Sequence, residues 1–199
     1  DSITVGSQEA LLKKFEELSA SDINARVSRP WSEGAQIIKN GQNVLKKNVV
    51  FALGTNSPNL TPAAIDEVVN LLGAEHNIIF VTNYSGDNST YDTNNEHFKE
   101  LAKNNSNIII ADWAETVKQN PSLYLTSDQI HPTQAGTELF AETIYKAINS
   151  NTNANGCSVN GEFQALVLGY AWPEYHRAPW HDRMPAYAQA VTQSISEGR

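Results

Sequence analysis

The chain has 199 residues, of which 40% are hydrophobic and 18% are charged, as in folded globular proteins and unlike disordered chains. Its formal net charge of −8 at pH 7 argues against nucleic acid or an anionic membrane surface as a partner, because both are bound through clustered Lys and Arg. The single cysteine, Cys157, excludes an internal disulfide and a cysteine-rich metal site.

Helical and strand patterns alternate over about the first 150 residues. In chain order we expect a helix over 7–21, a short strand over 23–27, a helix over 31–47, a strand over 48–54, a helix over 61–73, a strand over 77–83, a helix over 94–104, a strand over 107–113 and a closing helix over 133–148. The strands at 48–54, 77–83 and 107–113 are continuous apolar runs, which is typical of strands buried on both faces. The order predicts an α/β fold of three layers, with helices on both faces of a parallel sheet.

The composition changes after residue 150. Residues 150–161 include most of the Asn-rich run "NSNTNANG", which begins at Asn149, and are interpreted as a polar linker. Residues 162–199 are rich in proline and aromatic side chains and match none of the preceding units. We expect 1–149 to be one domain and 162–199 to be a separate extension, the start of another domain. Its aromatic side chains would stack on carbohydrate or, more commonly, pack into a small core or an interface.

Three short segments carry candidate chemistry: Ser2, the "GTNS" stretch at 54–57 and the "DQIHPT" stretch at 128–133. A serine hydroxyl becomes a good nucleophile only when a base takes its proton, and histidine oriented by a carboxylate is the usual base. The three-residue spacing of Asp128 and His131 lets the carboxylate reach the ring Nδ1 while Nε2 points elsewhere. A backbone N–H at Ser2 and the amide of Asn56 would serve as oxyanion donors.

Each of these segments also has an ordinary structural interpretation. "GTNS" fits a plain strand-to-loop turn, and "HPT" fits the entry of a helix with Pro near its first position. Asp112 would cap the following helix or border the cleft, and we favour the cap. The remaining histidines show no metal-ligand spacing, so we expect no metal.

Taken together, "DS" at the start, "GTNS" and "DQIH" resemble the motifs of the SGNH (GDSL-type) hydrolase superfamily. The resemblance implies a flavodoxin-like parallel sheet. It also implies that Ser2 is the nucleophile, that Asp128 and His131 complete a catalytic triad, and that Asn56 is an oxyanion donor. No cofactor is implied.

The stretches 23–34, 49–57, 94–98, 109–113 and 127–136 also look like the extracellular catalytic domain of peptidoglycan O-acetyltransferases, over about residues 1–149. Members of the superfamily often carry Gly where this chain has Ser28, whose backbone N–H would be a further oxyanion donor. The resemblance places these residues at the pocket: Asp1, Arg29, Gly54, Thr55 and Asn95. It implies a bacterial cell-surface location and covalent fusion to a membrane acyltransferase module. The extension 162–199 faintly resembles the lead-in to a cell-wall peptidase-type domain.

The first strand of the superfamily precedes its Asp-Ser pair, whereas this sequence begins at Asp1. We therefore expect that strand to be missing from this chain, and the sheet to be poorly stable without it. The function we expect is serine-dependent acetyl transfer or ester hydrolysis on cell-wall carbohydrate. The alternatives are a glycan-binding module without activity, in which Ser2 and His131 need not meet, and a generic esterase, lipase or thioesterase with an apolar acyl pocket.

Overall fold

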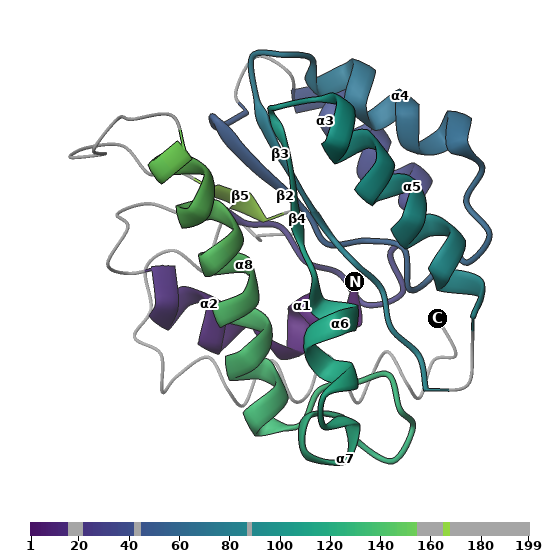
Figure 1. The fold of residues 1–199 in the computed structure, drawn as a ribbon, viewed down its shortest axis with the longest axis vertical. Coiled ribbons are helices and arrows are strands. Elements are labelled where there is room, and N and C mark those ends of the chain that lie inside the picture. The colour runs from purple at the N-terminus through teal and green to yellow at the C-terminus, as the bar shows by residue number, and fades with distance from the viewer. Residues whose placement is uncertain (16–21, 42–44, 87–88, 155–164, 168–199) are drawn as a thin grey trace.

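The computed structural model describes residues 1–15, 22–41, 45–86, 89–154 and 165–167. Its centre is a parallel sheet with the strand order β1-β5-β2-β3-β4 (Figure 1). The strands are β1 (Asp22–Ile23), β2 (Asn48–Phe51), β3 (Asn77–Val81), β4 (Ile108–Ala111) and β5 (Ala165–Val167). The predicted parallel sheet is therefore confirmed.

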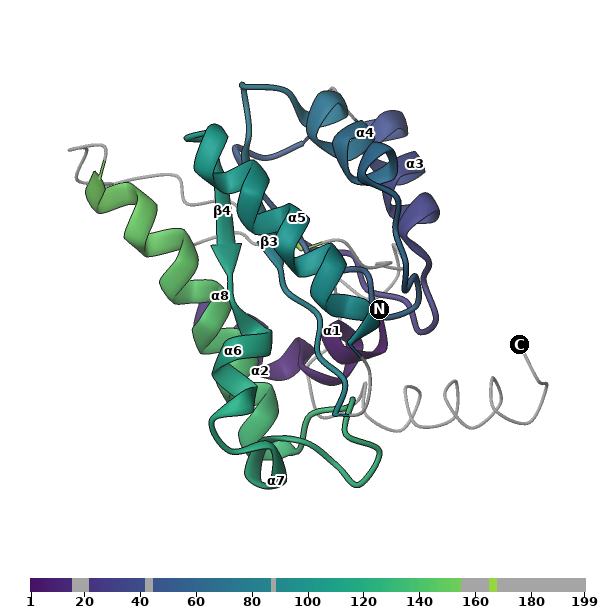
Figure 2. The same cartoon turned by 45° about the vertical axis from the view of Figure 1, so that its right-hand side comes forward.

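Helices cover both faces of this sheet, as Figures 1 and 2 show. One face carries α3 (Trp31–Gly41), α4 (Pro62–Leu72) and α5 (Thr90–Asn104). The other carries α1 (Ser2–Gly6), α2 (Gln8–Phe15), α6 (Trp113–Lys118) and α8 (Gln134–Ala154), with α7 (Pro121–Tyr124) packed against α8. The three-layer α/β architecture predicted from the sequence is thus present.

The central strands contribute side chains to two separate hydrophobic cores. Val49 and Phe51 of β2 pack with Trp31 under α3–α5, whereas Val50 packs with Ile144 under α8. Successive side chains of a strand point to opposite faces, so a continuous apolar run fills both cores at once. This explains why β2 and β3 show no alternation of polar and apolar residues.

The observed boundaries differ from the predicted ones mainly at element ends. The helix expected over 61–73 has the predicted Thr61 cap, Pro at its start and Gly73 at its end, where φ is +61°. The closing helix continues through Ala154, so residues 150–154 of the predicted linker are helical, and the rest of the predicted linker lies outside the described residues. The strand expected over 23–27 is only two residues long, because the chain turns into the loop that precedes α3. Helices α1 and α7 were not predicted, and α6 was expected only as the helix that Asp112 would cap.

The position of β5 corrects the prediction that all of 162–199 is a separate extension. β5 lies between β1 and β2 and pairs in parallel with both, with Leu166 opposite Asp22 and Val49. Flavodoxin-like sheets have the order 2-1-3-4-5, so β5 takes the position of their first strand. The gap expected in the sheet is therefore filled from the carboxyl-terminal part of the chain. Residues 155–164 and 168–199, including the aromatic segment, lie outside the described residues.

A chain ending at residue 161 is expected to lose much of its stability. β5 joins β1 to β2 through paired residues on both of its sides. Each lost hydrogen bond costs roughly 0.5–1.5 kcal/mol, so the free energy of unfolding should fall by several kcal/mol. Thermal unfolding followed by circular dichroism, with the 199-residue chain as control, checks this. Equal midpoints would mean that β5 does not support the sheet.

Candidate active site

Ser2 is the first residue of α1 and lies at the carboxyl ends of the central strands. Asp1 caps this helix, its side chain accepting the backbone N–H of Ile3 at 3.0 Å. Asp1 is buried and lines a small cavity together with Ala52 and Asn83, which follow β2 and β3. These contacts fix the start of α1 at the edge where parallel sheets place their ligands.

Asp128 and His131 lie in the loop between α7 and α8. The Asp128 Oδ1 accepts the backbone N–H groups of Ile130 and His131, both at 2.9 Å, which is the turn that an Asp side chain favours. The Thr126 hydroxyl donates to the same oxygen at 2.7 Å, and the Thr126 N–H donates to the His131 carbonyl at 2.8 Å. One carboxylate oxygen is thus occupied by the loop, and the other faces the imidazole ring.

Ser2, His131 and Asp128 form a continuous hydrogen-bonded series, which we call the Ser–His–Asp series. The His131 Nδ1 lies 2.7 Å from Asp128 Oδ2, and the His131 Nε2 lies 2.9 Å from Ser2 Oγ. A carboxylate only accepts, so Nδ1 carries the proton and Nε2 is left to accept from the serine hydroxyl. The contact between Asp128 and Nδ1 is the one that the three-residue spacing predicts. Ser2 comes from 129 positions earlier in the chain.

Asp128 is held in its ionised form. Burial opposes ionisation, but hydrogen bonds from the His131 N–H and ring, the Ile130 N–H and the Thr126 hydroxyl outweigh it and keep the pKa of Asp128 well below its usual range. The ordinary pKa of an aspartate is about 3.9. Because the folded pKa is the lower one, the ionised group stabilises the fold above about pH 4, and this contribution is lost as the pH falls further.

Asn56 lies in the turn that follows β2. Gly54 opens this turn with φ at +127°, a conformation that favours glycine, and the Ser57 N–H donates to the Gly54 carbonyl at 2.8 Å. The Asn56 side chain is exposed and makes no hydrogen bond to Ser2 or to any other residue that the structure describes. An amide group without an internal partner is available to a bound substrate.

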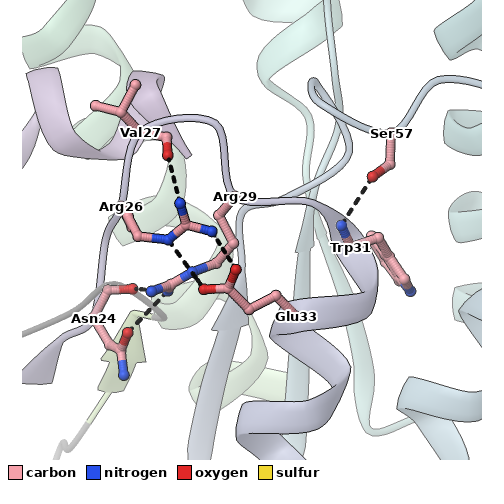
Figure 3. Close-up of polar contacts among 7 residues, drawn as sticks. All are labelled: Asn24, Arg26, Val27, Arg29, Trp31, Glu33 and Ser57. Atoms are coloured by element: carbon pink, nitrogen blue, oxygen red, sulfur yellow. Dashed lines mark hydrogen bonds and ion pairs between the residues drawn. The ribbon is translucent and has the colours of Figure 1, made fainter. Parts of the chain in front are cut away.

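Ser28 lies in the loop between β1 and α3, which Figure 3 shows. Its φ is +58°, in the left-handed region, which explains why a glycine suits this position. Its neighbour Arg29 is only 1% exposed and binds the Asn24 carbonyl and side-chain oxygen, both at 2.8 Å, and Glu33 at 3.0 Å. Arg26 also pairs with Glu33. These bonds hold the loop in the shape that presents the Ser28 backbone.

Replacing Ser28 with glycine is expected to stabilise the protein without loss of activity. A non-glycine residue in the left-handed region costs about 1–2 kcal/mol, and glycine adds about 0.5–1 kcal/mol of unfolded-state entropy. The net gain should be about 0.5–1 kcal/mol, a rise of about 1–4 °C in the unfolding midpoint. Ser28→Ala is the matched control and should gain nothing. A lower midpoint for Ser28→Gly would contradict the left-handed conformation of this residue.

Four of the five residues predicted to shape the pocket are buried: Asp1, Arg29, Gly54 and Asn95. A buried residue can still line a pocket, as Asp1 lines the small cavity beside Ile3, so the role of these residues in shaping the pocket stays a prediction. Asp1, Arg29 and Asn95 make hydrogen bonds within the segments that lead to the exposed site residues. Thr55 is partly exposed, and its hydroxyl accepts from the Asn83 amide at 3.4 Å.

Sequence reasoning missed residues that support the site. Asn83 and Tyr91 bond to the turn around Asn56, and Thr126 bonds to Asp128. The only sequence signal for Asn83 was its place at the end of the predicted strand 77–83.

Asp112 caps α6, accepting the Glu115 N–H, as predicted. No cluster of three His, Cys, Asp or Glu side chains in the described ranges is arranged to hold a metal ion.

No protein-family model matches the sequence, and no curated protein matches it. Among solved structures, the C-terminal catalytic domain of peptidoglycan O-acetyltransferase A from Streptococcus pneumoniae, determined with a methylsulfonyl adduct, matches with a TM-score of 0.71 and 30% identity. That match covers 77% of this chain and 91% of the other. A family 3 carbohydrate esterase from Clostridium thermocellum matches with a TM-score of 0.58 and 13% identity, over 76% of this chain and 89% of the other. The second likeness concerns the fold alone.

The fold and the Ser–His–Asp series define a three-layer α/β protein whose polar site lies at the carboxyl ends of its parallel strands. The first match is one of sequence as well as of fold, with 30% identity over 91% of the other chain. The chain belongs to the SGNH hydrolase superfamily and is related to the catalytic domain of peptidoglycan O-acetyltransferases.

Proposed function

We propose that this protein carries out acyl transfer, most simply of acetyl, or ester hydrolysis on cell-wall carbohydrate, through an acyl-enzyme on Ser2. The observation that carries the proposal is the Ser–His–Asp series, with 2.9 Å between Ser2 Oγ and His131 Nε2 and 2.7 Å between His131 Nδ1 and Asp128 Oδ2. The relationship to an O-acetyltransferase domain supports an enzyme of the esterase or acyltransferase kind.

In the first half-reaction, Ser2 Oγ attacks the acyl carbonyl carbon and forms a C–O bond. His131 Nε2 takes the hydroxyl proton, and Asp128 stabilises the imidazolium and keeps Nδ1 protonated. When the tetrahedral intermediate collapses, the ester C–O bond breaks. His131 gives its proton to the leaving alkoxide, which departs as an alcohol. The acyl group then remains on Ser2 as an ester.

The negative oxygen of the tetrahedral intermediate requires hydrogen-bond donors. The Asn56 amide and the backbone N–H groups of Ser2 and Ser28 are the donors we assign to it. Within the described ranges, none of these three groups is occupied by another hydrogen bond. Donors that are already in place strengthen their bonds as charge develops on the oxygen, and this lowers the barrier.

The second half-reaction repeats these steps with a new acceptor. An acceptor O–H gives its proton to His131 Nε2 while its oxygen attacks the acyl carbon, and Ser2 leaves with the returned proton. Water as the acceptor makes the protein an esterase, and a sugar hydroxyl makes it a transferase. The same residues perform both reactions, so the acceptor must be determined by experiment.

The openness of the site favours a bulky carbohydrate over a long acyl chain. The side chains of His131 and Asp128 are 45% and 48% exposed. The cavity that adjoins Asp1 and Ile3 has a volume of about 10 Å³, enough for about one water molecule. A short acyl group on a large, solvated substrate suits such a site. A lipase or thioesterase acting on long chains would need a roomier apolar pocket.

The distance between Ser2 and His131 also bears on the alternative of a binding module without activity. A relic site has no reason to retain a serine hydroxyl within hydrogen-bond distance of a correctly oriented imidazole. We therefore favour catalysis.

We place the activity at the bacterial cell surface, because the related enzyme modifies peptidoglycan. No helix within the described ranges is long and apolar enough to cross a bilayer. Fusion to a membrane acyltransferase module or to a cell-wall peptidase-type domain remains a prediction from the sequence.

The test combines acyl release with covalent labelling. The protein is incubated with p-nitrophenyl acetate, with and without a chito-oligosaccharide, and acetyl is measured on the sugar and in solution. Protein treated beforehand with methanesulfonyl fluoride serves as the blank. Its histidines remain unmodified, so it still shows any acetate release that they cause without the serine. Peptide mass spectrometry then locates the sulfonyl group, which we expect on Ser2. Acetyl on the sugar identifies a transferase, and acetate alone identifies an esterase. Release that sulfonylation does not reduce would overturn the proposal.

A further inference from the structure

The turn that carries Asn56 is held by buried polar side chains from two other elements. They are Asn83, which follows β3, and Tyr91, Asn94 and Asn95 of α5, which we call the turn-holding network. We propose that Tyr91, supported by Asn83 and Asn95, is a positioning residue that orients Asn56 toward the oxyanion. The inference rests on the proposed role of Asn56.

Tyr91 acts at the peptide bond next to Asn56. Its hydroxyl donates to the Thr55 carbonyl oxygen at 2.7 Å, and its side chain is only 6% exposed. The Thr55 carbonyl and the Asn56 N–H belong to one planar peptide group. Holding the carbonyl therefore fixes the direction of the Asn56 N–H and of the Asn56 Cα, from which the side chain departs.

Asn83 holds the other side of the same turn. Its amide donates to the Leu53 carbonyl at 3.3 Å and to the Thr55 hydroxyl at 3.4 Å. A Cβ on Gly54 would lie 2.0 Å from the Asn83 Oδ1, so Asn83 packs directly against the Gly54 backbone. Asn95 in turn fixes Asn83, donating to its carbonyl and accepting its N–H, both at 2.8 Å.

Asn94 completes the arrangement at the end of the turn. Its amide donates to the Ser57 carbonyl at 3.4 Å, and its side-chain oxygen accepts the Leu60 N–H at 3.1 Å. The turn-holding network therefore binds the backbone before, within and after residue 56. The Asn56 side chain itself stays exposed and has no partner among the residues that the structure describes.

This distribution of contacts indicates preorganisation for chemistry. Burying amide and hydroxyl groups costs free energy unless each is bonded, and apolar packing would hold a surface turn at less cost. In this protein three buried polar side chains, those of Asn83, Tyr91 and Asn94, converge on one short turn, and the buried Asn95 side chain holds Asn83. A donor contributes most to catalysis when its orientation is set before the reaction begins.

The first arm of the test is a double-mutant cycle between positions 91 and 56. Tyr91→Phe removes only the hydroxyl and should lower kcat about 10-fold with little change in KM. In the Asn56→Ala background, the same substitution should lower kcat by less than about twofold, because its target is already gone. An equal loss in both backgrounds would overturn the inference.

The matched control is Asn107→Ala. The Asn107 amide donates to the Gly73 and His76 carbonyls at 3.1 and 2.9 Å, at the opposite end of the strands. This variant also loses amide hydrogen bonds to a turn, so it should lower the unfolding midpoint but leave kcat unchanged. If Asn107→Ala lowered kcat as much as Tyr91→Phe does, the role of Tyr91 would be purely structural.

The second arm does not depend on activity. The NMR order parameters of the backbone amides at 55–57 should fall in Tyr91→Phe below the value of about 0.85 typical of rigid backbone, and stay unchanged in Asn107→Ala. Unchanged values in Tyr91→Phe would overturn the inference even if the protein catalyses nothing. A loosened turn in a protein that releases no acetyl would uphold the positioning role and refute the proposed reaction instead.

Discussion

Replacing Asp128 with asparagine is expected to lower kcat about 10⁴-fold while the fold stays intact. The Asp128 Oδ1 accepts three hydrogen bonds, from the Ile130 and His131 N–H groups and the Thr126 hydroxyl. The carbonyl oxygen of an asparagine can accept the same three. The loop should therefore keep its shape, and circular dichroism should show an unchanged fold.

The loss would arise from the histidine tautomer. With its oxygen occupied by the loop, the introduced asparagine would turn its NH₂ group toward the His131 Nδ1, which lies 2.7 Å from the present Asp128 Oδ2. An NH₂ group donates, so Nδ1 would have to accept and the ring proton would move to Nε2. A protonated Nε2 cannot take the proton of Ser2, and the nucleophile would no longer be activated.

Thr126→Val is the matched control for this variant. It removes the hydroxyl that bonds Asp128 Oδ1 but leaves the carboxylate facing the ring. We expect it to lower kcat by less than about 10-fold, since only one supporting bond is lost. If Asp128→Asn kept more than about a tenth of the activity, Asp128 would not set the tautomer, and the role assigned to it would be wrong.

Local patterns predict the parts of this fold that local physics determines. The helix at Pro62–Leu72 was predictable because a Thr cap, a Pro and a terminal Gly all act within its own sequence. The central strands were predictable because short unbroken apolar runs, bounded by turn residues, are typical of strands buried on both faces. β5 was not predictable. Three residues within a segment rich in proline and aromatic side chains show no periodicity, and the strands that β5 pairs with lie more than 100 residues earlier in the chain.

The same distinction applies to the site. Ser2, Asn56, Asp128 and His131 could be proposed from motifs, and the contact between Asp128 and His131 depends on neighbouring residues alone. Tyr91 reaches a carbonyl 36 positions away, and nothing in its own neighbourhood indicates this. The contacts of Arg29 were not predictable for a similar reason. Only the fold places Asn24 and Glu33 around its guanidinium.

Replacing Asn56 with alanine is the second change with a large expected effect, a loss of about 10²–10³-fold in kcat. The amide we assign to the oxyanion would be gone, while the backbone N–H groups of Ser2 and Ser28 would remain. The loss should fall on kcat with KM nearly unchanged, because such a donor binds the charged intermediate more strongly than the ground-state carbonyl. Steady-state kinetics with p-nitrophenyl acetate measures both constants.

Two further variants separate this role from a general disturbance of the turn. Asn56→Asp keeps the size of the side chain but presents a negative charge to the oxyanion, so it should be at least as impaired as Asn56→Ala. Asn59→Gly changes an exposed residue three positions away whose φ of +60° glycine also adopts, and it should keep full activity. An Asn56→Ala protein within about threefold of the wild-type kcat would mean that backbone N–H groups alone hold the oxyanion. The buried polar side chains around the turn would then serve the fold and not the reaction.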